Sequence, residues 1–391
     1  MLTALLAALP AGFGVAAWIY LISLRGGFWR ADVALHSATY REHGWPEVAV
    51  VIPARNEAET IAQVLEAHLR TVYRGPVHVI LVDDGSQDGT GAIARNLAAR
   101  APRPLTVVDA PPLPEGWTGK LWALEIGLAV QRELAPAAEW VLLTDADIVH
   151  ANDTLTRLVD HASDNRLALA SLMARLDDRG LWGRLLIPAF IFFFQKLYPF
   201  SWVNSPAHTT AAAAGGCVLI RRTVLEEIGG MAAIRGALID DVTLATTVKL
   251  GPPRRRIWLG LSRNAVVSLR DNRSLWSIWS MVSRTAFNQL RHSTGRLIGT
   301  VLGMAVIYLA GPLALLSFPL HGAPGAALLG ATAWGLAARA YWPTVRLYER
   351  PMTDTLWLPI AAALYTLMTA HSAVRHWTGR GSAWKGRTYP A

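Results

Sequence analysis

The chain has 391 residues, carries a formal net charge of +9, and is 52% hydrophobic but only 17% charged. This composition is too apolar for a purely water-soluble protein and favours a membrane protein larger than one average domain. The basic residues cluster near apolar segments and form no recognised nucleic-acid motif, so nucleic acid is excluded as a partner and anionic lipid headgroups are favoured. The single cysteine, Cys217, excludes an internal disulfide and favours a cytosolic main domain.

The first apolar segment, residues 2–24, contains no charged side chain and is long enough to cross a bilayer. Arg25 and Arg30 follow it, which is typical of a signal anchor. A cleaved signal peptide is the alternative, but no basic residue precedes the apolar run and no convincing small-residue cleavage site ends it. Residues 1–30 are therefore predicted to form an N-terminal transmembrane anchor.

Residues 47–292 are predicted to form an α/β domain. Its β-rich runs recur at about the thirty-residue period of βα units, at residues 48–52, 77–82, 105–108 and 140–144. This period predicts a Rossmann-like, mostly parallel sheet with flanking helices. Asn56 and Glu59 have the spacing of a capping box, and apolar residues then recur at helical intervals, which predicts a helix over one face of the sheet.

The most informative motif is the pair Asp145 and Asp147 at the end of the run 140–144. Because alternate residues leave a strand on the same side, the two carboxylates are expected to converge on one divalent cation that bridges them to a diphosphate. Such a triplet also arises by chance in a chain of this length, so the neighbouring motifs decide whether it is functional.

Polar residues also follow the earlier strands. Ligands of open α/β sheets bind beyond the carboxyl ends of the strands, so these groups should gather with Asp145 and Asp147. The residues concerned are Pro53, Arg55, Glu57, Asp83 and Asp84. For the last two, turn formation or helix capping is the alternative.

No glycine-rich dinucleotide turn and no P-loop occur, so a diphosphate must be held in another way. Lys120 is predicted to add a point charge, with a solvated surface lysine as the alternative. Gly215 and Gly216 precede a short predicted strand and would allow a ligand to approach the backbone closely, although tight packing explains such a pair equally well.

Asp240 and Asp241 begin a helical pattern as adjacent carboxylates. Their mutual repulsion can raise the pKa of one of them, and a carboxylate so placed can deprotonate a hydroxyl nucleophile. The alternative is a helix N-cap with a favourable first-turn charge.

The C-terminal part is apolar again, and residues 297–375 are predicted to contain two or three transmembrane segments followed by a basic tail at 376–391. A break at Gly311-Pro312 is an open alternative for the first of them. Two further stretches, 181–200 and 275–290, combine aromatic and basic residues and are predicted to be interfacial, with buried core helices as the alternative. Three C-terminal spans would place Arg375 outside, against the positive-inside tendency, so their number stays open.

The ordered motifs at 53–57, 83–86, 145–147, 215–216 and 240–241 resemble those of family 2 glycosyltransferases with a GT-A fold. A narrower likeness extends over nearly the whole chain and is to the hopene-associated glycosyltransferases of bacterial hopanoid biosynthesis. It is carried by segments that begin at Gly116, Pro188, Ala213, Arg235 and Arg375.

This resemblance implies an inverting transfer of a sugar from a nucleotide sugar, with a UDP-sugar favoured, to a lipid acceptor of hopanoid or polyprenyl type. Asp145 and Asp147 would bind Mg2+ or Mn2+, and Asp241 would be the base beside Asp240. The residues assigned to the nucleotide sugar are Pro53, Arg55, Glu57, Asp83, Asp84, Lys120, Asp145 and Arg291. Gly215 and Gly216 would lie on the acceptor side.

Related enzymes often end the catalytic domain with Gln/Arg-x-x-Arg-Trp, and the nearest stretch here is residues 288–292. Arg291 is retained from this motif as a diphosphate or acceptor contact. The positions of Asn288 and His292 differ from the motif, so their roles are left open.

The resulting prediction is a multi-pass protein of the bacterial inner membrane whose catalytic domain faces the cytosol. Two alternatives remain, a polyprenyl-phosphate glycosyltransferase and a non-catalytic nucleotide-sugar-binding scaffold of a lipid pathway. A transporter is disfavoured because no charged residue within the apolar segments marks a polar pathway.

Overall fold

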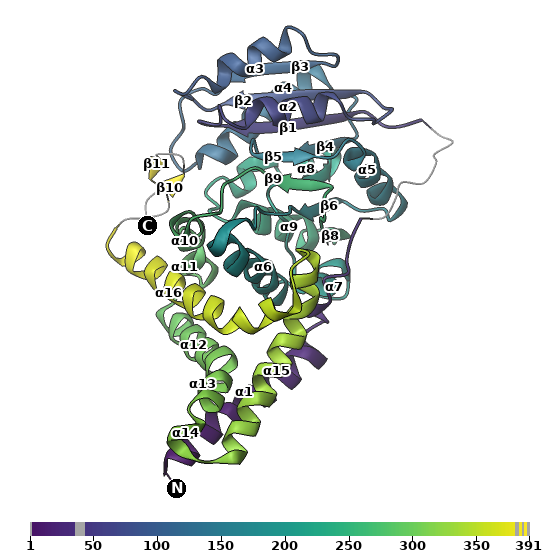
Figure 1. The fold of residues 1–391 in the computed structure, drawn as a ribbon. Helices are drawn as coiled ribbons and strands as arrows, with labels where there is room; N and C mark the ends of the chain where they lie inside the picture. Colours follow the sequence, from purple (N-terminus) through teal and green to yellow (C-terminus); the bar gives the residue numbers. More distant parts are fainter. Residues whose placement is uncertain (1, 36–43, 380–382, 385–386, 389–391) are drawn as a thin grey trace.

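The computed structural model describes residues 2–35, 44–379, 383–384 and 387–388. An α/β domain stands on a bundle of long helices, and the N-terminus lies at the end of the bundle farthest from the domain (Figure 1). The sheet and the bundle meet through a layer of shorter helices.

The central sheet has seven strands in the order β3-β2-β1-β4-β7-β6-β8. Its strands are β1 Val48–Ala54, β2 Val77–Asp83, β3 Leu105–Asp109, β4 Trp140–Leu143, β6 Leu169–Met173, β7 Val218–Arg221 and β8 Ile257–Leu261. All neighbouring strands pair in parallel except β7, which is antiparallel to β4 and to β6. The predicted mostly parallel sheet with flanking helices is confirmed.

Helices cover both faces of the sheet, so β1 is buried along its whole length. Alternate residues of β1 point to opposite faces: Val51 packs with α4 (Gly119–Leu134), whereas Val50 and Ile52 pack with α2 (Ile61–Leu69) and α5 (Thr154–Asp164).

The predicted capping box is wrong. Helix α2 begins at Ile61, its N-cap is Thr60, and no side chain caps it. Asn56 instead adopts a φ of 52° in the loop after β1, and its side-chain oxygen accepts a hydrogen bond from the backbone N–H of Gln87 at 2.9 Å. The side chain of Asn56 therefore joins two loops rather than starting a helix.

Apart from the long helix α6 Gly180–Leu197, the remaining elements before the bundle are short. A second sheet pairs β5 Ile148–His150 with β9 Val266–Ser268 in antiparallel fashion. The other elements are η1 Phe28–Arg30, α3 Thr90–Ala98, α7 Phe200–Asn204, α8 Arg222–Glu227, η2 Gly230–Ile234, α9 Asp240–Leu250, α10 Leu275–Ser283 and α11 Ala286–Gln289. A two-stranded hairpin of β10 Ala383–Trp384 and β11 Arg387–Thr388 follows the last helix.

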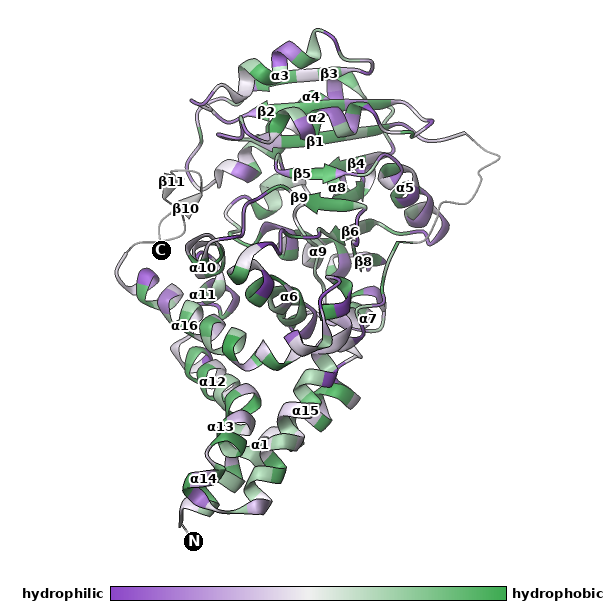
Figure 2. Ribbon diagram, in the orientation of Figure 1, coloured by the Kyte–Doolittle hydropathy of each residue, from purple (hydrophilic) through white to green (hydrophobic). Residues whose placement is uncertain are grey.

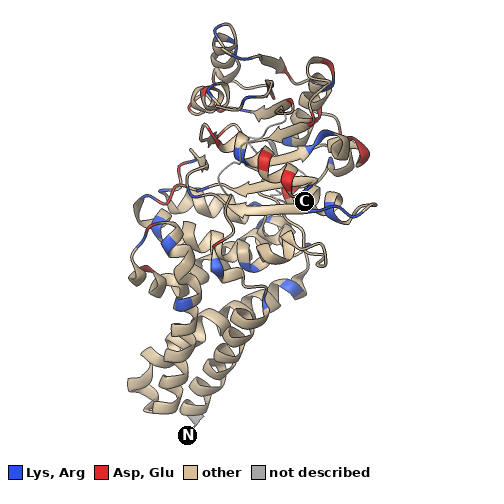
Figure 3. Ribbon diagram, turned by 90° about the vertical axis from the view of Figure 1, so that its right-hand side faces the viewer, with Lys and Arg blue, Asp and Glu red and all other residues tan. Residues whose placement is uncertain are grey.

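Three helical passes form the bundle. They are α1 Leu2–Leu24, the continuous run of α12 Thr294–Met304, η3 Ala305–Leu309 and α13 Ala310–Leu316, and α15 Pro324–Leu347. Helix α15 packs against both α1 and α13, and α14 Phe318–His321 makes the turn at the far end. The bundle is hydrophobic over most of its surface and is nearly free of charged residues away from the domain (Figures 2 and 3).

The break proposed at Gly311-Pro312 is absent. The helix continues to Leu316 and instead widens into the π-helical turn of η3 just before the proline. A proline lacks the N–H donor and crowds the preceding turn, and a wider turn at that point accommodates both effects.

Four segments of the described chain are long and apolar enough to cross a membrane, namely Thr3–Leu24, Gly180–Leu197, Thr294–Leu316 and Met352–Trp377. The last comprises η4 Met352–Trp357 and α16 Leu358–Trp377. Helix α16 crosses the top of the bundle and packs against α6, α10 and α11 (Figure 1). The stretch 275–290, expected as one segment, forms the two short helices α10 and α11.

Gly127 allows α4 to approach the sheet closely, because a Cβ at this position would lie only 2.3 Å from Val51 Cγ1 and 3.2 Å from Val82 Cγ2. Replacing Gly127 with Ala should therefore destabilise the protein by about 1–3 kcal/mol, even though alanine is the better helix former. The loss should appear as a lower melting temperature of the detergent-purified protein. Gly299→Ala in α12 is the control, since its Cβ would meet no atom within 4 Å. A melting temperature for Gly127→Ala at or above that of the wild type would contradict this packing.

Candidate active site

A cavity of about 530 Å³ opens where β1 and β4 end, between the α/β domain and helices α10 and α16. Its wall includes six acidic and four basic residues, namely Glu57, Glu59, Asp145, Asp147, Asp240, Asp271, Lys120, Arg270, Arg284 and Arg375. A site with charges of both signs suits a polyanionic ligand that is accompanied by a cation.

Asp145 and Asp147 both line this cavity, but the reason differs from the one predicted. Strand β4 ends at Leu143, so the two residues lie in the turn between β4 and β5 rather than on a strand. A hydrogen bond from Ile148 N to Asp145 O at 3.2 Å closes this turn. The carboxylates are therefore brought together by a turn and not by the alternation of a strand.

Lys120, in the first turn of α4, joins two of the acidic motifs. Its Nζ lies 2.8 Å from Asp145 Oδ1 and 3.1 Å from Asp240 Oδ2, and its side chain is only 20% exposed. It is therefore not a solvated surface lysine. Burial alone would lower the pKa of the Lys120 ammonium, but the carboxylates of Asp145 and Asp240 raise that pKa above its ordinary value.

The antiparallel strand β7 brings the glycine pair to the same place. Leu143 at the end of β4 pairs with Val218 at the start of β7, so the residues before β7 lie beside those after β4. Gly215 lines a smaller adjoining cavity with Lys120, Asp240 and Asp241. A Cβ on Gly215 would stand 3.1 Å from Lys120 Nζ, so a side chain there would crowd the site.

Asp240 and Asp241 are the first two residues of α9. Asp241 Oδ2 accepts a hydrogen bond from Gly215 N at 2.9 Å, and its Oδ1 accepts one from Val242 N at 2.8 Å. Burial, together with the neighbouring charge of Asp240, raises the pKa of Asp241 to about 6, while Lys120 opposes this rise. The carboxyl of Asp241 is thus oriented by two backbone donors and titrates near neutral pH.

Gly216 acts through its backbone. Thr144 Oγ1 donates a hydrogen bond to Gly216 O at 2.8 Å, and a Cβ on Gly216 would lie 3.1 Å from Ile148. The glycine pair therefore lets β7 and the turn after β4 lie against each other.

Pro53 and Glu57 line the large cavity, whereas Arg55, Asp83 and Asp84 do not. Asp84 is buried and pairs with Arg55, whose Nη1 lies 3.8 Å from Asp84 Oδ2, and Asp83 Oδ1 accepts a hydrogen bond from Ser86 N at 2.9 Å. These contacts join the loops after β1 and β2, which agrees with the turn-forming alternative for the two aspartates.

Arg291 also lies outside the cavity, in an exposed turn where it has a φ of 51°. Asn288 Oδ1 hydrogen-bonds to His292 Nε2 in the same turn. The arginines that do line the cavity are Arg270, Arg284 and Arg375, none of which was assigned to the site from the sequence. In the sequence, Arg284 lies in a predicted interfacial stretch, and Arg375 begins a segment that carries the family resemblance. Only the tertiary structure shows that both line the same cavity as Asp145.

Within the described residues, no group of three or more His, Cys, Asp or Glu side chains is placed to hold a metal ion by itself. Asp145 and Asp147 nevertheless offer two carboxylates to one cavity. Mg2+ is commonly bound by one or two carboxylates and completes its coordination with substrate phosphates and water. The two carboxylates therefore suit a cation that binds together with a diphosphate.

Comparison with known proteins identifies the family that part of the chain resembles. Residues 49–229 match the family described as Glycosyl transferase family 2. Over 116 residues the chain is 34% identical to the polyprenol monophosphomannose synthase of Mycolicibacterium smegmatis, covering 28% of this chain and 39% of that protein. Over 113 residues it is 32% identical to the succinoglycan biosynthesis protein ExoA of Rhizobium meliloti, covering 29% and 32%. The chain thus spans less than two fifths of the length of these two relatives.

A solved structure extends the likeness to the whole fold. The mannosyltransferase PcManGT from Pyrobaculum calidifontis, in complex with GDP-Man and Mn2+, aligns with a TM-score of 0.50 and 24% identity, covering 93% of this chain and 98% of that one. The chain has the GT-A fold. Residues 49–229, which include Asp145, Asp147 and Gly215, are the part of the chain that resembles the family 2 glycosyltransferases.

Replacing Lys120 with Met should destabilise the protein more at pH 8 than at pH 5. Without the ammonium, the pKa values of Asp145 and Asp241 rise further above their unfolded values, so stability is lost as the pH rises through these native pKa values and is regained as it falls. We expect a loss of about 2 kcal/mol at pH 8, less than for a fully buried pair because Asp145 is partly exposed.

The measurement is the melting temperature of the variant at both pH values. Lys120→Arg keeps the positive charge and serves as the control, with a smaller loss. An equal loss for Lys120→Met at pH 5 and pH 8 would show that packing, rather than charge, explains the role of this residue.

Proposed function

We propose that the protein is an inverting glycosyltransferase that moves a sugar from a cytosolic nucleotide sugar to a lipid held in the membrane. The observation that carries this proposal is the position of the cavity. The carboxylates of Asp145, Asp147 and Asp240 line it on the side of the sheet. Helices α10 and α16 line it on the other side, and α16 packs against α12 and η3 of the apolar bundle.

The nucleotide-sugar end would be held by the carboxylates after β4. Asp145 and Asp147 would bind Mg2+ or Mn2+, whose charge would stabilise the diphosphate as it leaves. PcManGT binds GDP-Man and Mn2+, which supports a cation-dependent donor site. It also makes a GDP-sugar a second candidate donor, in addition to the UDP-sugar favoured from the sequence. Lys120 would add a fixed positive charge at the same end of the cavity.

Asp241 is the proposed base. Its two backbone hydrogen bonds orient the carboxylate, and a pKa of about 6 leaves most of it ionised at neutral pH and able to accept a proton. In a single displacement, the acceptor oxygen bonds to the anomeric carbon as the bond to the diphosphate oxygen breaks. The hydroxyl proton passes to Asp241, and no covalent sugar adduct forms.

We propose that α1, the α12–α13 run and α15 cross the membrane and that α6 and α16 do not. Segment η4, which leads directly into α16, is tied to α6 by a bidentate ion pair between Arg184 and Asp354, at 2.5 and 2.6 Å. The end of α16 is tied to α10 by a hydrogen bond from Trp279 Nε1 to His371 Nδ1 at 2.8 Å. Since both ends of α16 contact elements of the catalytic side, this helix would lie along the membrane surface.

The charge distribution supports a cytosolic catalytic domain. Residues 2–24 and 297–338 contain no acidic or basic residue other than His321, whereas Arg25 follows α1, and Arg339 and Arg346 lie in the second half of α15. The basic residues of the bundle lie toward the domain (Figure 3). With α16 on the membrane surface, Arg375 also stays inside, and the conflict with the positive-inside tendency disappears.

The identity of the acceptor lipid is a more specific part of the proposal. The sequence resemblance supports a hopanoid or a neighbouring step of hopanoid biosynthesis in the bacterial inner membrane. The polyprenol monophosphomannose synthase among the relatives favours a polyprenyl phosphate as the second candidate. A scaffold without activity would bind a nucleotide sugar but would not release the nucleoside diphosphate from it.

Replacing Asp147 with Ala should lower kcat/KM by about 10²–10³-fold. The reason is that the cation proposed to stabilise the leaving diphosphate then loses one of its two carboxylate ligands. The measurement is release of UDP or GDP from nucleotide sugars in the presence of membrane lipid extract, with and without a chelator. Asp109→Ala is the matched control: Asp109 also ends a strand of the same sheet, but it is exposed and pairs with Arg95. No release by the folded wild-type protein with any common nucleotide sugar would contradict catalysis.

Cysteine labelling tests the membrane arrangement. The natural Cys217 is fully buried, and burial raises the pKa of its thiol to about 12, so the wild type should not react with a membrane-impermeant maleimide. In sealed right-side-out vesicles, Leu320→Cys at the far end of the bundle should be labelled directly. Thr378→Cys, just after α16, should be labelled only after detergent is added. Direct labelling of Thr378→Cys would mean that α16 crosses the membrane.

A further inference from the structure

The side of the cavity nearest the bundle is basic. Arg270 follows β9, Arg284 ends α10 and Arg375 lies in the last turn of α16, and all three line the same cavity as Asp145 and Asp147. We call these three arginines the basic wall. The first and last of them are 105 residues apart in the sequence, so only the packing of α16 on α10 completes the wall.

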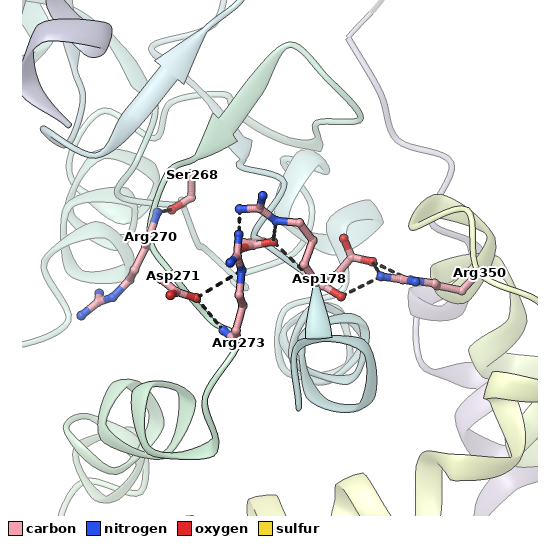
Figure 4. A network of polar contacts seen from close by, with 8 residues as sticks. Asp178, Ser268, Arg270, Asp271, Arg273 and Arg350 are labelled. Atoms are coloured by element: carbon pink, nitrogen blue, oxygen red, sulfur yellow. Dashed lines mark hydrogen bonds and ion pairs between the residues drawn. The ribbon is translucent and has the colours of Figure 1, made fainter. Parts of the chain in front are cut away.

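Two arginines of the basic wall, Arg270 and Arg375, lack the ion pairs that neighbouring arginines make within the described part of the chain. Arg350 donates to Asp178 Oδ2 at 2.7 Å, and Arg179 pairs with Asp177 at 2.7 Å. In the same region the side chain of Arg270 extends away from these pairs (Figure 4). Among the described residues, no carboxylate lies within ion-pair distance of Arg270 or Arg375.

The like charges of the wall also oppose one another. Burial first, and then the charge of Arg270, lower the pKa of Arg284, while the carboxylates across the cavity work against this shift. Clustered arginine side chains of this kind are stabilised by an anion that they bind together. The cavity is large enough to admit one between the wall and the carboxylates.

The position of Arg375 is set by contacts on the preceding turn of α16. His371 accepts a hydrogen bond from Trp279 Nε1, and Ser372 Oγ accepts one from Phe287 N at 3.0 Å. These bonds join α16 to α10 and α11, while Trp377 on the next turn is 55% exposed. Arg375 therefore lies where the apolar surface of α16 meets the cavity.

We propose that the basic wall is a phosphate-binding subsite and that Arg375 makes a direct contact with a substrate phosphate group. This proposal rests on the function proposed above and adds the C-terminal helix to the active site. Two substrates would present this chemistry, the diphosphate of the nucleotide sugar and the phosphate of a polyprenyl-phosphate acceptor. If the acceptor were a neutral polyol lipid, the basic wall would bind only the diphosphate of the donor.

The experiment compares Arg375→Gln with the wild type in two binding assays that do not require turnover. In the first, the affinity of the full-length protein for UDP and for GDP is measured by calorimetry with Mn2+ present. In the second, binding to vesicles that contain undecaprenyl phosphate is measured against vesicles that contain undecaprenol. Loss of a charge-assisted hydrogen bond should weaken binding about tenfold in the assay that contains the bound phosphate.

Two variants control the result. Arg296→Gln removes an exposed arginine near the membrane side that does not line the cavity, so it corrects for general attraction to lipid. Arg375→Lys keeps the charge and should recover part of the affinity. A weakening in the nucleotide assay assigns the wall to the donor, and a weakening specific to undecaprenyl phosphate assigns it to the acceptor.

The proposal is wrong if Arg375→Gln, with an unchanged melting temperature, binds within twofold of the wild type in both assays. The function proposed above would survive that result provided that the wild type releases nucleotide and Asp147→Ala lowers this release as predicted. Failure of the wild type to release nucleotide would instead count against the enzyme mechanism, so the two outcomes are distinguishable.

Discussion

The contact of Lys120 with Asp145 and Asp240 is the interaction on which the site depends. It joins the first turn of α4, the turn after β4 and the start of α9, which are far apart in the sequence. Asp147 and Asp241 lie close by, so four carboxylates share one partly buried region. One ammonium offsets part of their repulsion, and the remaining negative charge makes this end of the cavity attractive to a divalent cation.

The reversed strand β7 makes this gathering of groups possible. In a wholly parallel sheet, the segment before a strand lies at the edge opposite to the segment after its neighbour. Because β7 runs against β4, the residues before β7 and after β4 meet at one edge. Gly215 can then donate its N–H to Asp241, and the absence of a side chain on Gly215 leaves room for Lys120.

Contacts between the apolar helices and the domain would, in the proposed function, connect catalysis to the lipid phase. Arg350 and Asp354, in the segment between α15 and α16, pair with Asp178 and Arg184 at the beginning of α6. The far end of α16 then reaches the cavity. Hydropathy alone marks α16 as a candidate span, whereas its contacts at both ends with the polar domain are the basis of the proposal that it lies along the membrane surface.

Much of this arrangement follows from the sequence, because it depends on local patterns. The β-rich runs, the acidic pairs after them and the start of a helix at Asp240 all appear in the structure near their predicted places. The capping box at Asn56 and the break at Gly311-Pro312 do not, because a loop contact with Gln87 and a π-helical turn replace them. In each case a contact or a helical distortion outside the local pattern decided the outcome.

By itself, the sequence determined the parallel sheet, the position of the acidic motifs along the chain and the apolar character of both ends, since side-chain periodicity and composition are properties of neighbouring residues. Only the tertiary structure decided that Asp84 pairs with Arg55 rather than lining the cavity, that Lys120 bridges two aspartates, and that Arg375 faces them. The physical reason is that these contacts arise where separate segments pack together, and no spacing within one segment encodes the direction in which another will approach it.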